Sequence, residues 1–442
     1  MAICKLNDSK IINTLMKYFW KLIYNIILFP AAYFIAVILA ILNKKIRAGL
    51  IGRFRTYSKL KNEFPHRNRD RLVYWFHAAS HGEFEQVKPI LAGLKEIEPD
   101  CYCIVSFFSP SGYNNVEDEH IDCKIYLPAD FPWNCRRALR RTRPHKLIFA
   151  EYDVWPNLVW SAEKLNIPTT LFAARLQKKS PKGWPILRSF YRQVYGSINS
   201  VYTVGEKDHI AVKRILPRGS KSVIRVLGNP RYDRVKDLAD QFTIDRTKSV
   251  LHRQKGIIAG SVWPEDEMVI LKPLTDLVKN GSEVFLYWVP HEPKGKFIDN
   301  TVRQFQQLNL EPVLMSECGL TPNNGEQVLI IDHVGLLAEL YWKGRIAYVG
   351  GGFSTGVHNV MEPAIARLPV IFGPKFHNSD AAEALIEAGG GFPTSNSEQF
   401  SQTLHELMTN DEKFLQASLA ATGVIHENIG SATRVVRGII RD

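Results

Sequence analysis

The sequence predicts an α/β protein with two doubly wound domains behind an N-terminal hydrophobic helix. Short apolar runs of strand length alternate with helical patterns between residues 71 and 372, which is typical of parallel sheets covered by helices. These runs form two sets, separated near residues 228–233, and a length of 442 residues suits two domains. We therefore expect an anchor with its basic flank at residues 1–50, a first domain at 51–235 and a second domain at 236–442.

The N-terminal segment contains an uncharged run of 21 residues at positions 22–42. As a helix this run would be about 30 Å long, the thickness of a bilayer core, and it exceeds the apolar region of a signal peptide. Seven Lys or Arg residues follow it between positions 44 and 61, against four between positions 5 and 21. This bias favours a single uncleaved anchor with a cytoplasmic body, and a helix lying in the membrane surface is the alternative.

The positive charge is unevenly distributed. The net charge is +12, and residues 1–69 contain 13 Lys or Arg against Asp8 and Glu63, so this segment carries +11 and the rest of the chain +1. A nucleic-acid-binding protein would spread basic residues over its folded body, whereas charge beside a hydrophobic segment indicates anionic lipid. We expect anionic membrane lipid and no nucleic acid as a partner.

A dense arginine run follows in the first domain, comprising Arg136, Arg137, Arg140, Arg141 and Arg143. Such a run is usually a solvated helix face. Beside an anchor, contact with lipid headgroups or with a phosphorylated lipid is the alternative.

Several site types are excluded by their missing motifs. The six cysteines lack zinc-site spacing and fit a reduced cytoplasmic protein. The chain contains no Walker Gly-Lys-Ser/Thr, no G-x-S-x-G, no H-E-x-x-H and no G-x-G-x-x-G. We expect neither a metal nor a bound cofactor.

Polar residues follow three predicted strands of the first domain, where parallel strands place them at one sheet edge. Glu83 could take a proton from a substrate hydroxyl, or it could serve only as the partner of a helix dipole. Glu151 and Asp153 suit sugar hydroxyls and could equally cap the next helix. Arg175 suits a carboxylate or phosphate, with a surface salt bridge as the alternative. These residues alone do not decide between the alternatives.

A glycine-rich stretch organises the second domain. Residues 350–356 follow an apolar run, and Asn359 can begin a helix that contains Glu362. The start of such a helix offers N–H groups and a positive dipole end to phosphate, and a carboxylate suits ribose hydroxyls. Ser261 and His291 follow two other predicted strands, so the sequence predicts a nucleotide site at this edge.

Seven segments, in this order, resemble the motifs of the Kdo transferases, the 3-deoxy-D-manno-octulosonic acid transferases of lipopolysaccharide synthesis. The resemblance extends from the anchor to about residue 395. The segments are His77-Ala-Ala-Ser-His-Gly-Glu83, Asp130-Phe-Pro-Trp-Asn-Cys-Arg-Arg137, Glu151-Tyr-Asp-Val-Trp-Pro-Asn157, Ala174-Arg-Leu176, Gly228-Asn229 with Asp233, Ala259-Gly-Ser261, and residues 350–363 with Phe372-Gly-Pro374. The chain departs from the family at Ala173, where Asn is usual, and at Pro290-His-Glu-Pro-Lys294, where the family has R-H-P-E-R.

The resemblance implies a GT-B architecture, in which two Rossmann-like domains face a central cleft that closes for catalysis. It implies an inverting transfer of Kdo from CMP-Kdo onto lipid IVA, a lipid A precursor, at the bacterial inner membrane. It makes Glu83 the general base. The acceptor or sugar residues are Ser80, Gly82, Glu151 and Arg175, and the CMP residues are Ser261, His291, Gly351, Gly352, Asn359 and Glu362.

Two other functions remain as alternatives. A GT-B enzyme that uses a UDP-sugar and a lipid-linked acceptor would share the glycine-rich loop and the ribose-binding glutamate. A membrane-bound scaffold that binds a sugar nucleotide without turnover would share the whole donor site.

Overall fold

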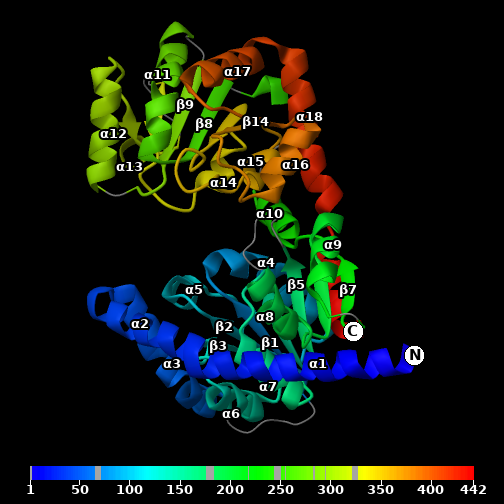
Figure 1. The fold of residues 1–442 in the computed structure, drawn as a ribbon. Coiled ribbons are helices and arrows are strands. Elements are labelled where there is room, and N and C mark those ends of the chain that lie inside the picture. The colour runs from blue at the N-terminus through cyan, green and yellow to red at the C-terminus, as the bar shows by residue number, and fades with distance from the viewer. Residues whose placement is uncertain are drawn as a thin grey trace. The chain divides into compact units, whose positions relative to one another are not determined.

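The computed structural model describes the chain except residues 1, 65–70, 176–183, 218, 243–249, 254, 282–283, 294 and 321–326, with side chains from residue 13 onward. It consists of two compact units (Figure 1). Unit 1 contains Met1–Arg234 and Gly430–Asp442, and unit 2 contains Val235–Ile429.

The described part of unit 1 contains a parallel seven-stranded sheet of order β3-β2-β1-β4-β5-β6-β7. Because β2 and β4 flank β1, the chain reverses its direction across the sheet between β1 and β4, which makes this the topological switch point. Helices cover both faces of the sheet (Figure 1), and a separate hydrophobic core fills each face. The strands are β1 Val73–Ala78, β2 Tyr102–Phe107, β3 Cys123–Tyr126, β4 Lys146–Ala150, β5 Thr169–Ala174, β6 Ser200–Thr203 and β7 Val223–Val226.

The described part of unit 2 repeats this design with the strand order β10-β11-β9-β8-β12-β13-β14, again parallel. Its switch point lies between β8 and β12, because β9 and β12 flank β8. The strands are β8 Lys255–Val262, β9 Val284–Pro290, β10 Val313–Leu314, β11 Val328–Ile330, β12 Ile346–Val349, β13 Val370–Phe372 and β14 Gly391–Pro393.

The helices connect the strands in both units. Those of unit 1 are α1 Ala2–Ile23, α2 Phe29–Leu42, α3 Lys44–Glu63, α4 His81–Ile97, α5 Pro110–Asn115, α6 Pro132–Thr142, α7 Pro156–Lys164, α8 Pro185–Tyr195, α9 Glu206–Ile215 and α19 Ser431–Arg441. Helix α10, Arg231–Asp240, crosses from unit 1 into unit 2. Those of unit 2 are α11 Pro264–Asn280, α12 Gly295–Gln307, α13 Met315–Cys318, α14 Leu337–Leu340, α15 Met361–Ile365, α16 Asp380–Ala388, α17 Ser397–Thr409 and α18 Asp411–Asn428.

The last helix differs from the sequence-based expectation, which assigned all residues after 236 to the second domain. Helix α19 belongs to unit 1, because Val435, Val436 and Ile439 are buried in one of its two cores. Asp233 fixes the start of the helix by accepting hydrogen bonds from the Gly430 and Ala432 backbone N–H groups at 2.6 and 2.9 Å. This is a long-range contact that sequence periodicity does not reveal.

The N-terminal segment is one long apolar helical stretch that packs along unit 1. Residues Asn13–Leu42 have the length and composition of a membrane-crossing helix, and few of them are buried. A π-helical turn at Tyr24–Leu28 joins α1 to α2. One side of the stretch contacts the body, where Trp20 and Tyr24 pack with Trp160 and Phe190. The opposite side leaves large apolar side chains exposed.

Asp130 connects this helical stretch to the body. Its buried carboxylate accepts hydrogen bonds from the Tyr24 hydroxyl at 2.8 Å and from the Asn157 and Leu158 backbone N–H groups at 3.0 Å. It therefore caps the first turn of α7. Burial raises the pKa of Asp130 to about 6, although these hydrogen bonds oppose the shift.

We expect Asp130→Asn to remove a pH dependence of stability. The native carboxyl holds its proton up to about pH 6, against 3.8 for an ordinary Asp, so between these values the native state binds more protons than the unfolded state. Relative to the variant, wild-type stability should therefore fall by up to about 3 kcal/mol as the pH rises through this window. Urea denaturation at pH 4 to 7 measures the difference. The exposed Asp100→Asn is the control, and parallel curves for wild type and Asp130→Asn would contradict the assignment.

Candidate active site

Two carboxylates flank the switch point of unit 1. Glu83 lies in the first turn after β1, and Glu151 directly follows β4, the neighbouring strand. Arg175 follows β5, the next strand in the sheet. The structure thus brings these sequence-predicted residues to one edge of one sheet.

Glu83 begins helix α4 in a capping box with Ser80. One carboxylate oxygen, Oε2, accepts hydrogen bonds from the Ser80 hydroxyl and from the Ser80 backbone N–H at 2.9 Å. The helix-start role that the sequence left open is therefore present. Within the described part of the chain, Oε1 has no protein partner, and the half-buried side chain is accessible to solvent. One oxygen holds the side chain in place while the other is available to a substrate proton.

Glu151 is buried in an unusual backbone conformation. Its φ of +58° lies in the left-handed region, which costs a non-glycine residue about 1–3 kcal/mol and concentrates at functional sites. The Gln86 amide donates a hydrogen bond to Oε1. Burial raises the pKa of Glu151, which the nearby Arg231 guanidinium opposes most strongly. Ala173, at the end of β5, shares the left-handed conformation at +50°.

Arg231 is a site residue that the sequence did not reveal. From the start of α10, its guanidinium donates a hydrogen bond to the Gly82 carbonyl oxygen at 2.8 Å and lies 3.7 Å from the Glu151 carboxylate. It therefore bridges the two strand ends that carry the glutamates. Arg175 also lowers the pKa of Glu151, so two cations face this carboxyl. Leu176, the neighbour of Arg175 in its motif, lies outside the described residues.

The remaining motif residues of unit 1 have structural partners. The buried His77 places its Nε2 atom 2.9 Å from Asp153 Oδ2, which also accepts a hydrogen bond from the Trp155 indole at 3.2 Å. Asn157 exchanges hydrogen bonds with Asn25 of the N-terminal stretch. Asp153 and Asn157 thus position α7 and the N-terminal stretch. Glu151 is therefore the acidic residue of the segment 151–157 that remains as a candidate for substrate binding.

We expect Arg231→Met to move the acid limb of the kcat/KM–pH profile to higher pH. Without the guanidinium, the pKa of Glu151 rises further, so the ionised form is lost at a higher pH. We also expect kcat/KM to fall by about 10- to 100-fold, because a charge-assisted contact at the site is lost. The matched control is Arg234→Met, one helical turn on, whose guanidinium pairs with Glu85 at 2.7 Å. An unmoved acid limb in Arg231→Met would contradict the coupling.

The glycine-rich loop of unit 2 lies at the second switch point. It follows β12, and Ser261 lies near the end of the adjacent β8 with a φ of +54°. A Cβ on Gly350 would overlap the Ser261 carbonyl oxygen, so the two strand ends touch through backbone. Gly351 has a φ of +89°, and a Cβ there would overlap the Gly356 carbonyl oxygen. Only glycine fits these two positions.

Asp266 holds this loop in place. The carboxylate is fully buried at the start of α11 and accepts hydrogen bonds from the Gly351 N–H at 2.7 Å, the Trp263 N–H at 2.9 Å and the Tyr348 hydroxyl at 2.8 Å. The amide of Gly351, which the sequence assigned to the nucleotide, is thus already bound to a carboxylate. Gly351 and Gly352 shape the loop closely around Asp266.

Three half-buried rings lie beside this loop. Trp263 stacks on His291 with ring centroids 4.1 Å apart, and its indole N–H donates to His358 Nε2 at 2.8 Å. Burial lowers the pKa of His358 to about 4, assisted by His291, and also lowers the pKa of His291. Because Nε2 accepts a hydrogen bond, neutral His358 carries its proton on Nδ1. The rings therefore present neutral surfaces and one fixed tautomer.

A short helix follows the loop at Met361–Ile365, where the sequence predicted it. Helix α15 has five residues, so its dipole is small, and the predicted phosphate site cannot depend on a long helix. Asn359 Oδ1 accepts the Met361 N–H at 3.1 Å, and its amide donates to Glu362 Oε1 at 2.8 Å. Asn359 thereby fixes the carboxylate that the sequence assigned to ribose.

Three of these groups escaped the sequence analysis as site residues: Arg231, Asp266 and Trp263. The signal for Asp266 and Trp263 was present, because both come directly after β8. Arg231 lies between Gly228-Asn229 and Asp233, a segment whose sequence indicates a linker and a family motif but does not single out Arg231. Among the described residues, no three His, Cys, Asp or Glu side chains gather as possible metal ligands.

Comparison with known proteins finds similarity to one family of enzymes. The family model described as 3-deoxy-D-manno-octulosonic-acid transferase (kdotransferase) matches residues 50–234. A 3-deoxy-D-manno-octulosonic acid transferase of Aquifex aeolicus is 27% identical over 362 residues, covering 80% of this chain and 91% of the relative. One of Haemophilus influenzae is 26% identical over 369 residues, covering 82% and 85%. These matches support the Kdo transferase family for this chain.

The family assignment confirms the resemblance inferred from the seven motifs. The crystal structure of a UDP-GlcNAc 2-epimerase from Neisseria meningitidis, bound to UDP-GlcNAc, is also similar, with a TM-score of 0.60 over 84% of this chain and all of that one. At 14% identity this likeness concerns the fold alone, and it confirms the predicted α/β class with two parallel sheets. The family match at residues 50–234 falls within the unit that carries Glu83 and Glu151.

Proposed function

We propose that this protein is a Kdo transferase that moves Kdo from CMP-Kdo onto lipid IVA with inversion at the anomeric carbon. The observation that carries the proposal is the pair of switch-point sites, one with two glutamates in unit 1 and one with the glycine-rich loop in unit 2. Acceptor and proton chemistry belong to the first, and the nucleotide to the second. Family membership supports Kdo as the transferred sugar.

In the proposed step, a sugar hydroxyl of the acceptor attacks the anomeric carbon of Kdo. Glu83 Oε1 takes the hydroxyl proton as the new C–O bond forms, and the bond to the CMP phosphate breaks with its electron pair on the phosphate oxygen. Arg231 and Arg175 oppose the protonation of Glu151 that burial favours, and its ionised form accepts hydrogen bonds from sugar hydroxyls. Ser80 and Gly82 shape the approach to Glu83.

In the donor site, we assign the ribose hydroxyls to Glu362, which Asn359 orients. Ser261, His291 and the turn formed by Gly351 and Gly352 lie around the CMP phosphate. The dissociating group is a nucleoside monophosphate, which a few N–H donors can stabilise without a metal or other cofactor. The residues of this site are supported by their common sheet edge and by the motifs that named them.

Nucleotide competition tests the donor. CMP should raise the unfolding temperature of the full chain more than UDP at equal concentration, because only the bound state gains free energy from ligand. A larger shift with UDP would overturn the CMP assignment and favour the UDP-sugar transferase. A scaffold that binds CMP without turnover is distinguished from an enzyme by measuring CMP release from CMP-Kdo in the presence of lipid IVA.

We also propose that the body lies on the cytoplasmic side of the inner membrane, attached by the N-terminal stretch in the plane of the membrane surface. Contacts with the body extend from Lys17, which pairs with Glu163, to Tyr33, which packs on Phe131. These residues are about 24 Å apart along a helix, so a spanning helix would draw the body deep into the bilayer. The exposed apolar side of the stretch would instead face the lipid.

A basic hollow supports contact with anionic lipid. It has a volume of about 440 Å³, and its lining residues are Tyr57, Trp133, Arg136, Arg137, Arg140 and Arg141. Arg143, which the sequence placed on the same helix face, instead ends α6 with a left-handed backbone. Trp133 is exposed and aromatic, as is typical of membrane interfaces, and the four guanidinium groups suit lipid phosphates.

The position of the first residues distinguishes the two membrane arrangements. With Lys10→Cys as the reporter, we expect an impermeant maleimide to react from the cytoplasmic side, because an in-plane stretch never crosses the bilayer. The natural cysteines are replaced by serine as background control. Labelling only from the periplasmic side would contradict the in-plane arrangement and establish a spanning helix.

A further inference from the structure

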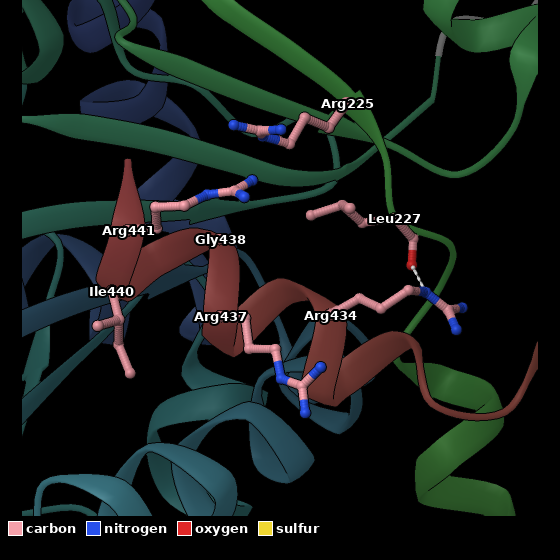
Figure 2. A pocket seen from close by; sticks show the side chains of 7 residues that line it. All are labelled: Arg225, Leu227, Arg434, Arg437, Gly438, Ile440 and Arg441. Carbon is pink, nitrogen blue, oxygen red and sulfur yellow. Dashed lines mark hydrogen bonds between the residues drawn. The ribbon is translucent and has the colours of Figure 1, made fainter.

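A second arginine-rich hollow lies in unit 1 between the edge strand β7 and helix α19 (Figure 2). Its volume is about 460 Å³. Three of its arginines come from α19 at positions 434, 437 and 441, a spacing that places them along one helix face, and Arg225 comes from β7. The opposite face of α19 is buried in the core of unit 1, so the helix is fixed and its arginine face is turned outward.

The hollow holds more positive charge than its own acid can balance. Arg225 forms a two-pronged ion pair with Asp442 at 2.9 and 3.0 Å, and Arg441 lies 3.3 Å from the same carboxylate. Arg434 donates a hydrogen bond to the Leu227 carbonyl oxygen at 3.0 Å. Among the described residues, Arg437 makes no ion pair or side-chain hydrogen bond. Four arginines face one aspartate, which leaves a net charge of +3.

Residues 70–442 carry a net charge of only +1, so this positive charge is a local concentration. Like charges at helical spacing repel one another and destabilise a helix. The pair formed by Arg225 and Asp442 demonstrates that a forked carboxylate fits this rim. The excess of positive charge destabilises the helix, and the hollow already accommodates one carboxylate. Together these features indicate a ligand that supplies further negative charge.

The hollow is also lined by apolar residues. These are Leu227, Gly438 and Ile440, and Ile440 is 41% exposed. Guanidinium groups beside apolar lining residues suit a ligand with an anionic group and an apolar portion. We propose that this hollow binds a phosphorylated amphiphile, with its phosphate against Arg434 and Arg437 and its apolar portion on Leu227 and Ile440. The proposal does not depend on the transfer reaction.

A titration with soluble short-chain lipids tests this site. The full chain in phosphatidylcholine nanodiscs is titrated with dihexanoylphosphatidic acid, dihexanoylphosphatidylcholine and inorganic phosphate. We expect phosphatidic acid to bind at least about tenfold more tightly than either of the others, because only it offers both the charge and the apolar portion. If inorganic phosphate bound as tightly as phosphatidic acid, the apolar portion of the ligand would have no role and the proposal of an amphiphile would be wrong. If phosphatidylcholine bound as tightly as phosphatidic acid, the proposed role of the arginines would be wrong.

Variants separate this site from general attraction to a basic protein. Arg434→Ala with Arg437→Ala should weaken phosphatidic acid binding at least about tenfold, and Arg437→Ala alone should weaken it several-fold. Lys279→Ala with Arg303→Ala removes the same charge from exposed positions of unit 2 and should leave the affinity unchanged. Arg437→Ala should also keep or raise the unfolding temperature. Unchanged binding in both arginine variants, or a lowered unfolding temperature in Arg437→Ala, would contradict the site.

Discussion

Glu83→Gln should lower kcat by about 10²- to 10⁴-fold, the range expected when a general base is lost. Glutamine at this position keeps the capping box, because its side-chain oxygen still accepts the Ser80 backbone N–H. Stability should therefore stay close to that of wild type, and CMP should still bind, because the donor residues are in unit 2. Steady-state kinetics and thermal unfolding of the same preparation measure the two effects separately.

The matched control is Glu85→Gln, two positions along the same helix. Glu85 pairs with Arg234 and has no contact with Ser80, so the variant removes an equal charge without touching the proposed base. It should turn over at a rate close to wild type. Near-wild-type turnover of Glu83→Gln would leave Glu83 only its capping role.

Asp266→Ala should cause the largest loss of stability. The substitution leaves three hydrogen-bond donors without an acceptor: the Tyr348 hydroxyl and the backbone N–H groups of Gly351 and Trp263. Each unpaired buried donor costs about 1–3 kcal/mol of stability. We therefore expect the free energy of unfolding to fall by about 3–9 kcal/mol. CMP binding should weaken as well, because the glycine-rich loop loses the carboxylate around which it folds.

Urea denaturation and CMP titration measure these two effects. Glu265→Ala removes the exposed neighbouring carboxylate and should change neither. A free energy of unfolding for Asp266→Ala within about 1 kcal/mol of wild type would contradict the role of Asp266 as the anchor of the loop, since a single stranded donor already costs that much.

Much of the architecture could be predicted because it follows local patterns. Apolar runs such as residues 346–349 are strands buried on both faces, and Glu83 and Glu151 come directly after such runs. Parallel pairing then brings their ends together. Periodicity does not reveal which unit a helix packs against, and two such placements became clear only from the structure. Helix α19 belongs to unit 1, and the N-terminal stretch is connected to α7 through Asp130.

The missed residues act at long range in sequence. Asp266 holds an amide 85 residues away, and Arg231 reaches a carbonyl 149 residues away. The local sequence around Asp266 or Arg231 does not indicate which distant backbone group the side chain contacts. The sequence did predict Asn359 at the start of the short helix after β12, but it did not reveal that the Asn359 amide also orients Glu362.

The central claim is that the chain transfers Kdo with Glu83 as base and the nucleotide in unit 2. The most direct measurement incubates the purified full chain with CMP-Kdo and lipid IVA and follows CMP release, with product analysis by mass spectrometry. We expect one CMP released for each Kdo gained by the lipid, with Glu83→Gln inactive at the same enzyme concentration while still binding CMP. No release of CMP across pH and detergent conditions would contradict the account.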